Sequence, residues 1–213
     1  MNILDYVAKA ARALERAGLD YALVGGLACV LMGVRRTTED ADFIVKVESA
    51  ADAGRLIGEL RREGLDVVER EVFGALADRG HFTIIVGEWR LDFKFASSAL
   101  DLETLGRAVE VEVAGARVRV APLEENIAAK LLVLRSLKDI EDALWLMVQH
   151  RDVIDWERLR LLLGSEPRQL VERILAEIKG EFHGDAAVES KLRELERRLE
   201  ELGRPRKGRG GGK

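Results

Sequence analysis

The pattern of apolar residues changes once along the chain, at Pro122. Before it, short β-prone runs alternate with segments of helical periodicity, and after it the periodicity is helical. Such a change predicts an α/β (α+β) fold, in which a small mixed sheet with flanking helices over residues 1–121 is followed by a helical domain over 122–203. Residues 204–213 have no large apolar side chain to bury, and we expect a disordered basic tail there.

The first part divides at its glycines into expected elements. Only Gly87 and Glu88 separate two β-rich runs, which predicts a tight hairpin with positive φ at the glycine. We expect helices over residues 2–17, 27–34 and 49–63, and strands over 21–24, 40–47, 66–68, 81–86, 89–95, 109–113 and 117–120. After Pro122 we expect helices over 123–136, 138–150, 155–163, 167–179 and 187–202.

Composition narrows the class of protein. A hydrophobic fraction of 47% over 213 residues is ample for a core. No apolar run approaches the roughly 20 residues that span a bilayer, and the first residues lack the apolar stretch of a secretory signal, so we expect a cytoplasmic protein without a membrane partner. The net charge of -4 argues against a surface coated with basic residues for non-specific nucleic-acid binding.

Two aspartates interrupt an otherwise β-prone run. Asp40 and Asp42 are two residues apart, so on a strand they project from the same face, while Ala41 and Phe43 point to the other. Carboxylates held this close repel each other, and a hard divalent cation such as Mg²⁺ or Mn²⁺ relieves the repulsion. Such ions in proteins usually also bind substrate phosphates, so the pair predicts a phosphate-bearing substrate.

A third carboxylate has the same setting. Asp92 alternates with Leu91 and Phe93 in a later strand, and Lys94 follows on the side of Asp92. Asp92 could complete a site for two metal ions, and Lys94 could hold phosphates. Taken alone, the acidic pair could equally be a surface feature that pairs with nearby basic side chains.

A glycine pair favours a phosphate-binding site over a surface feature. Gly25 and Gly26 stand between a short strand and an apolar helical segment. Glycines there let backbone amides approach phosphate oxygens at the start of the helix. As a lone motif, the pair is weak.

Together these segments resemble a known family. The combination of Val24-Gly-Gly26, Gly33-Val-Arg-Arg-Thr-Thr-Glu-Asp-Ala-Asp42 and Arg90-Leu-Asp92 resembles the nucleotidyltransferase superfamily typified by DNA polymerase β. The resemblance implies that Gly25 and Gly26 hold a nucleoside triphosphate. It also implies that Asp40 and Asp42 ligate both metal ions, and that Asp92 is the third ligand and the base.

Further segments are similar to a smaller group of that superfamily. Arg36-Thr-Thr38 before the acidic pair looks like the minimal transferases, including those grouped with AbiEii-like toxins, and implies that Arg36 and Thr38 bind nucleotide. Lys130, and Lys138 within Lys138-Asp-Ile-Glu-Asp142, are similar to basic segments of the same group and would face the nucleotide or the acceptor. Alternatively, these lysines belong to an ion-paired helix face.

The sequence therefore predicts a metal-dependent nucleotidyltransferase that uses a nucleoside triphosphate. Its acceptor hydroxyl could belong to RNA or tRNA, to a protein or to a small molecule such as an aminoglycoside, with RNA slightly favoured. One alternative is a catalytically silent module that binds nucleotide or RNA, as a regulator or as half of a toxin and antitoxin pair. The three carboxylates argue against it. Another is a metal-dependent phosphohydrolase, which has less need of the glycine turn.

Overall fold

The computed structural model describes residues 1–203 of the chain. It divides into two compact units, Met1–Asn126 and the residues from Ile127 onward. The expected basic tail, 204–213, lies outside the described residues. Within the part described, no helix is both long enough and apolar enough to cross a membrane.

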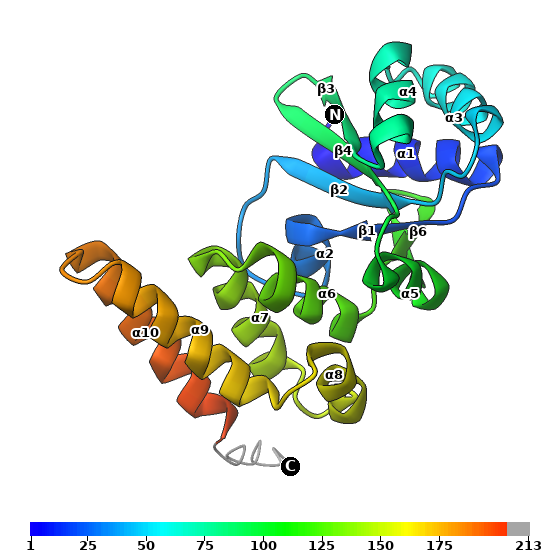
Figure 1. The fold of residues 1–213 in the computed structure, drawn as a ribbon. Coiled ribbons are helices and arrows are strands. Elements are labelled where there is room, and N and C mark those ends of the chain that lie inside the picture. Colours follow the sequence, from blue (N-terminus) through cyan, green and yellow to red (C-terminus); the bar gives the residue numbers. More distant parts are fainter. Residues whose placement is uncertain (204–213) are drawn as a thin grey trace, which may run out of the picture. The chain divides into compact units, whose positions relative to one another are not determined.

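The first unit is built on one six-stranded sheet (Figure 1). Its strands are β1 (Tyr21–Val24), β2 (Asp40–Val45), β3 (His81–Val86), β4 (Trp89–Phe95), β5 (Val109–Val113) and β6 (Ala116–Val120), in the order β3-β4-β2-β1-β6-β5. The pairs β1–β2, β3–β4 and β5–β6 are antiparallel, whereas β2–β4 and β1–β6 are parallel. The sheet is therefore mixed, as the sequence predicts.

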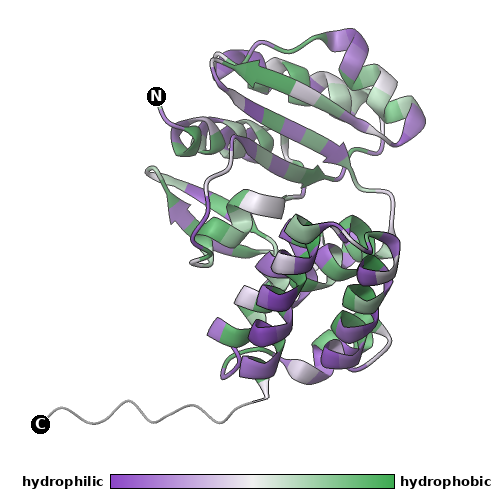
Figure 2. Ribbon diagram, turned by 90° about the vertical axis from the view of Figure 1, so that its left-hand side faces the viewer, coloured by the Kyte–Doolittle hydropathy of each residue, from purple (hydrophilic) through white to green (hydrophobic). Residues whose placement is uncertain are grey.

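Strand alternation separates the core side of the sheet from the side that carries the aspartates. Phe43 on β2 and Phe93 on β4 are fully buried, and their rings stack with centroids 5.2 Å apart. Phe82 on β3 continues the stack at 4.8 Å from Phe93. Figure 2 shows hydrophilic residues interrupting hydrophobic ones along these strands. The aromatic stack thus fixes which residues of β2 and β4 face away from the core.

Helices cover the core side and part of the other side. The helices α1 (Ile3–Ala17), α3 (Ala50–Arg62) and α4 (Glu69–Asp78) supply apolar residues to the main core. On the opposite side, α5 (Ala99–Arg107) packs Leu105 against Ala22 and Ile44. The short α2 (Gly25–Leu31) follows β1 directly. The contacts of α5 thus lie at Ala22 and Ile44 rather than at Asp40 and Asp42, which are half-buried.

The structure differs from the expected elements in three places. Residues 66–68 are not a strand but lead into α4, because Val72 and Ala75 are buried at helical spacing while Val68 is 53% exposed. Helix α5 has no counterpart among the expected elements, although Ser98 and Asp101 form a capping box at its start. The helix expected over 123–136 is instead α6 (Leu123–Ala129) continued by the π-helix η1 (Lys130–Leu134), which Arg135 ends at a φ of 55°.

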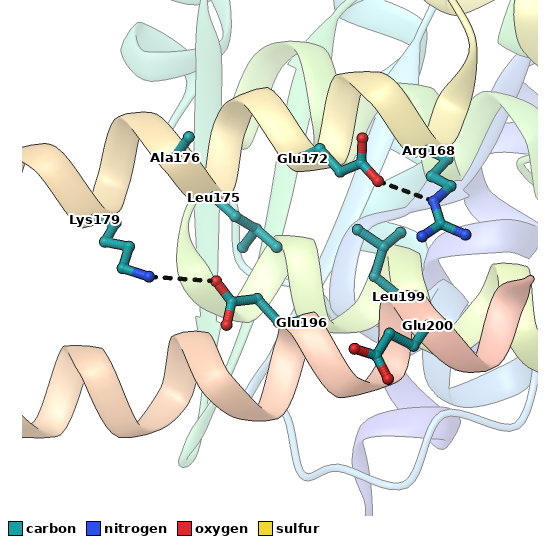
Figure 3. A pocket seen from close by; sticks show the side chains of 8 residues that line it. All are labelled: Arg168, Glu172, Leu175, Ala176, Lys179, Glu196, Leu199 and Glu200. Atoms are coloured by element: carbon teal, nitrogen blue, oxygen red, sulfur yellow. Dashed lines mark hydrogen bonds and ion pairs between the residues drawn. The ribbon is translucent and has the colours of Figure 1, made fainter.

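The helical unit contains η1, α7 (Leu137–Gln149), α8 (Trp156–Leu163), α9 (Pro167–Glu181) and α10 (Ala186–Leu202). Helix α10 packs against both α7 and α9. A groove between α9 and α10 is lined mainly by charged side chains (Figure 3). Arg168 pairs with Glu172 at 2.9 Å, and Lys179 lies 3.8 Å from Glu196. Such exposed pairs contribute little to stability, and the opposite charges leave no one-sided field for a ligand.

Candidate metal and nucleotide site

Three carboxylates meet on the open side of the sheet. Asp40 and Asp42 lie on β2, and the parallel register of β2 and β4 places Asp92 directly beside Asp42. One oxygen atom from each carboxylate lies within 4.8 Å of the other two, and all three residues are half-buried. Ala41 and Phe43, between and after the pair, are fully buried on the other side. The structure thus brings together the three aspartates that the sequence singles out.

The chemistry of this cluster suits a hard divalent cation. Its donors are carboxylate oxygens alone, and Mg²⁺ and Mn²⁺ prefer oxygen ligands. Three like charges at this spacing repel one another, and a divalent cation offsets that repulsion. The residues present therefore fit the metal that the sequence motif implies, and Asp40, Asp42 and Asp92 are the side chains that would hold it.

Two neighbouring side chains hold the carboxylate of Asp92. The Thr83 hydroxyl donates to Asp92 Oδ1 at 2.5 Å, and Arg90 Nη2 donates to Oδ2 at 2.8 Å. The hydrogen bond to Asp92 and the negative charges of Asp92, Asp40 and Asp42 raise the pKa of the Arg90 guanidinium. The sequence motif includes Arg90 without a role, and it does not include Thr83.

The two glycines let backbone and side chains approach closely. Gly25 has a φ of 70°, and a Cβ atom there would overlap Asp42 Oδ2. A Cβ atom on Gly26 would lie 2.8 Å from Arg36 Nη2 and 3.2 Å from Thr38 Oγ1. A substituted side chain at either position would therefore displace a residue of the site. The Arg36 guanidinium thus lies beside Gly26, in the first turn of the short helix α2.

A second hydroxyl holds a second carboxylate. Thr38 Oγ1 donates to Asp40 Oδ1, and it also lies 3.3 Å from the backbone oxygen of Asp40. Thr38 thus orients the first residue of β2 from the loop that precedes the strand. The motif places this threonine two residues before the acidic pair, so its proximity could be predicted from the sequence.

Lys94 is on the expected side of β4, where it forms an ion pair with Asp101. Its Nζ atom lies 2.9 and 3.0 Å from the two carboxylate oxygens of Asp101, in the first turn of α5. Burial opposes ionisation of Asp101, but hydrogen bonds from Lys94, Ser97 and Ser98 outweigh it and lower the pKa of the carboxyl. Asp101 therefore connects Lys94 to the start of α5, although it belongs to none of the sequence motifs of the site.

The two lysines of the helical unit have different settings. Lys130 is buried, and its Nζ atom lies 2.9 Å from both Asp139 Oδ1 and Asp142 Oδ2. Burial opposes ionisation of Asp139, but hydrogen bonds from Ser136 and Lys130 lower the pKa of the carboxyl below its usual value. Lys138, in the first turn of α7, is exposed. Lys130 thus matches the ion-paired alternative, although the pair is buried rather than solvated.

Comparison with known proteins gives only distant structural similarities. No family model matches the chain, and no curated protein matches it. The chain is similar to the antibiotic-resistance factor ANT(2'')-Ia, with 19% identity, coverage of 90% of this chain and 97% of that one, and a TM-score of 0.41. It is also similar to an antigenic nucleotidyltransferase-like protein from Paracoccidioides brasiliensis (17% identity, 90% and 92% coverage, TM-score 0.47).

A putative nucleotidyltransferase from H. pylori is a third similar structure, with 16% identity, coverage of 94% of this chain and 93% of that one, and a TM-score of 0.48. Scores and identities this low do not establish a family. The function of this chain therefore has to be inferred from its own residues.

Proposed function

We propose that this protein transfers a nucleoside monophosphate from a nucleoside triphosphate to a hydroxyl group, with release of pyrophosphate. The observation that carries the proposal is the cluster of Asp40, Asp42 and Asp92 directly beside the turn at Gly25 and Gly26. Carboxylates that hold cations and a turn open to phosphates are the two parts that nucleotidyl transfer requires.

Each residue has a role that follows from its position. Asp40, Asp42 and Asp92 would hold Mg²⁺ or Mn²⁺, which when bound neutralises charge on the phosphates. The missing side chains at Gly25 and Gly26 let Asp42 and Arg36 lie against the turn, and we assign the backbone of the two glycines to the triphosphate. We assign Arg36, Thr38 and Lys94 to the same nucleotide site, where the lysine would exchange Asp101 for a phosphate group.

The bond changes balance without a further reactant. The acceptor oxygen forms a bond to the α-phosphorus as the bond from that phosphorus to the bridging oxygen of pyrophosphate breaks. The hydroxyl proton leaves to a carboxylate of the cluster, and we assign this step to Asp92. Holding both reactants in line, with their charges compensated, supplies most of the rate enhancement.

The acceptor is a separate part of the proposal. RNA, including tRNA, is our preferred acceptor, ahead of a protein or an aminoglycoside-like small molecule. Membership of the minimal, AbiEii-like group and the existence of an antitoxin partner are also proposals, which rest on Arg36, Thr38 and the lysines of the helical unit. Exposed Lys138 is the better placed of the two lysines to contact a substrate, since Lys130 is buried.

Label transfer from α-³²P nucleoside triphosphates tests the proposal. The protein is incubated with each triphosphate, Mg²⁺ and one acceptor class at a time, and the wild type is compared with Asp42→Asn. We expect label on one acceptor and pyrophosphate in solution for the wild type, and a loss of at least about 100-fold for the variant, because it removes one ligand charge. Asp78→Asn, an exposed carboxylate at the end of α4, is the matched control.

The products separate the alternatives. Pyrophosphate with labelled acceptor supports transfer, whereas release of inorganic phosphate without labelled acceptor supports a phosphohydrolase. Nucleotide binding without any turnover supports the silent binding module. Wild-type turnover by Asp42→Asn would exclude the assigned site.

A further inference from the structure

Thr83 lies outside every motif of the candidate site but contacts one of its carboxylates. It is on β3, directly opposite Asp92 in the antiparallel β3–β4 pair. Its hydroxyl donates to Asp92 Oδ1 at 2.5 Å. No residue of β3 carries an acidic or strongly basic side chain. The hydroxyl of Thr83 is therefore the group of this edge strand that binds a carboxylate of the cluster.

The register of the β3–β4 hairpin places Thr83 opposite Asp92. The two-residue turn between β3 and β4 pairs Val86 with Trp89, and counting back along the strands pairs Thr83 with Asp92. Opposite residues in an antiparallel pair have Cβ atoms roughly 5 Å apart, which is within reach of a short hydroxyl side chain. Threonine is β-branched, so the position of its hydroxyl is restricted by few accessible rotamers.

The contact decides which way the carboxylate points. An aspartate on a strand can rotate about its side-chain bonds, and only some orientations direct an oxygen toward Asp40 and Asp42. With a donor from Thr83 on Oδ1 and a donor from Arg90 on Oδ2, the Asp92 carboxylate is held in one orientation. Each oxygen atom retains a further lone pair for a cation.

We propose that Thr83 is a positioning residue that orients Asp92 for metal binding. This inference rests on the proposed function, because it assigns Asp92 to the metal site. In this role Thr83 acts through its hydrogen bond to Asp92 and is not itself a metal ligand. Hydrogen-bond partners of metal ligands typically change metal affinity or activity by roughly 10-fold to 100-fold when they are removed.

The effects of Thr83→Val and Thr83→Ser distinguish a positioning role from a purely structural one. Threonine and valine have nearly the same shape and a similar preference for strands, so Thr83→Val preserves the strand and replaces the hydroxyl with a methyl group. Thr83→Ser restores the hydroxyl without the methyl group. If the residue only stabilised β3, valine would be as good as threonine and serine would be worse. If the hydroxyl positions Asp92, the order is reversed.

Binding of Mn²⁺ followed by electron paramagnetic resonance tests the inference without turnover. We expect Thr83→Val and Thr83→Ala to raise the dissociation constant for Mn²⁺ roughly 10-fold or more, and Thr83→Ser to stay within about threefold of the wild type. Ile85→Ala is the control, because Ile85 is on the same side of β3 and is 74% exposed. Its affinity should match that of the wild type.

Steady-state kinetics add a second readout. For Thr83→Val we expect a lower kcat, an unchanged KM for the triphosphate, and partial recovery at raised Mg²⁺. Wild-type Mn²⁺ affinity in both Thr83→Val and Thr83→Ala would overturn the inference, while the proposed function would stand if the wild type transferred label. A wild-type protein that neither binds Mn²⁺ nor transfers label would overturn both.

Discussion

Gly25 meets two requirements at a single position. Its φ of 70° lies in the left-handed region, and its Cα hydrogen faces Asp42 Oδ2 where a methyl group would overlap that atom. An L-residue in the left-handed region costs about 1–2 kcal/mol. The overlap adds to this cost, because Asp42 must rotate or the backbone must shift. The position therefore couples the stability of the β1–α2 turn to the geometry of the carboxylate cluster.

We expect Gly25→Ala to lower the free energy of unfolding by about 1–3 kcal/mol and to reduce nucleotidyl transfer by roughly 100-fold, since a displacement of about 1 Å has that effect on positioned groups. Thermal denaturation and the label-transfer assay measure the two effects. Gly58→Ala is the matched control: Gly58 lies inside α3 with no neighbour within 4 Å of the added carbon. The Gly58→Ala variant should be more stable than the wild type by up to about 1 kcal/mol. Equal effects of the two substitutions would contradict this account.

Single residues of the site differ in how far the sequence predicts them. Asp40, Asp42 and Asp92 are recognisable because polar residues interrupt apolar strands. Thr83 could also have been found, since the two-residue turn fixes its partner in β4. The contact of Gly25 with Asp42 could not, because it depends on which strands pair within the sheet, and spacing along the chain does not determine that.

At the scale of elements, the capping residue Asp101 at the start of α5 also binds Lys94 of β4. Asp101 accepts hydrogen bonds from the backbone of Ser97 and Ser98 and from Lys94. These bonds lower the pKa of Asp101 although burial opposes them. The ionised carboxylate therefore stabilises the fold at pH values above its unfolded pKa of roughly 3.9, and this contribution is lost as the pH falls through the lower, folded pKa.

We expect Asp101→Asn to lower the free energy of unfolding at neutral pH, by on the order of 1 kcal/mol. The difference between wild type and variant should shrink as the pH is lowered from about 5 toward 3. Denaturant unfolding at a series of pH values measures it. A difference that does not change with pH would show that ionisation of Asp101 is not its source.

Some elements are predictable and others are not, for physical reasons visible in the chain. Strands β3 and β4 follow from composition and the Gly87-Glu88 turn, and the structure gives their expected bounds. Helix α4 contains Gly74 and has only a short buried stripe, so its helical signal is weak. The π-helix η1 arises where Lys130 turns inward to two aspartates, and apolar periodicity does not report such a contact.

The Lys130 ion cluster should be structural, and its neighbour Lys138 provides the comparison. Lys130→Met leaves the carboxylates of Asp139 and Asp142 without their buried countercharge, and we expect a loss of about 3–5 kcal/mol. Lys138→Met, on the exposed side, should stay within about 0.5 kcal/mol. Denaturant unfolding gives both values. A stable Lys130→Met protein that has lost nucleotide binding would instead support the substrate role that the sequence predicts.

At the scale of the whole molecule, the first unit has an apolar core of its own. The main apolar core of the first unit is drawn from residues between Ile3 and Val120, and all six strands lie within it. The carboxylate cluster, both glycines and Thr83 belong to the same unit. Metal binding should therefore need this unit alone, and we propose that the helical unit contributes to recognition of the acceptor.

A shortened chain of residues 1–129, which keeps α6 whole, tests this division. We expect it to unfold cooperatively and to bind Mn²⁺ within about threefold of the full chain, because it retains the core and all three carboxylates. Circular dichroism melting and electron paramagnetic resonance measure the two properties. If the fragment folds and binds Mn²⁺ but no longer labels the acceptor, acceptor recognition depends on the helical unit. A fragment without a cooperative transition would show that the first unit requires the helices that follow it.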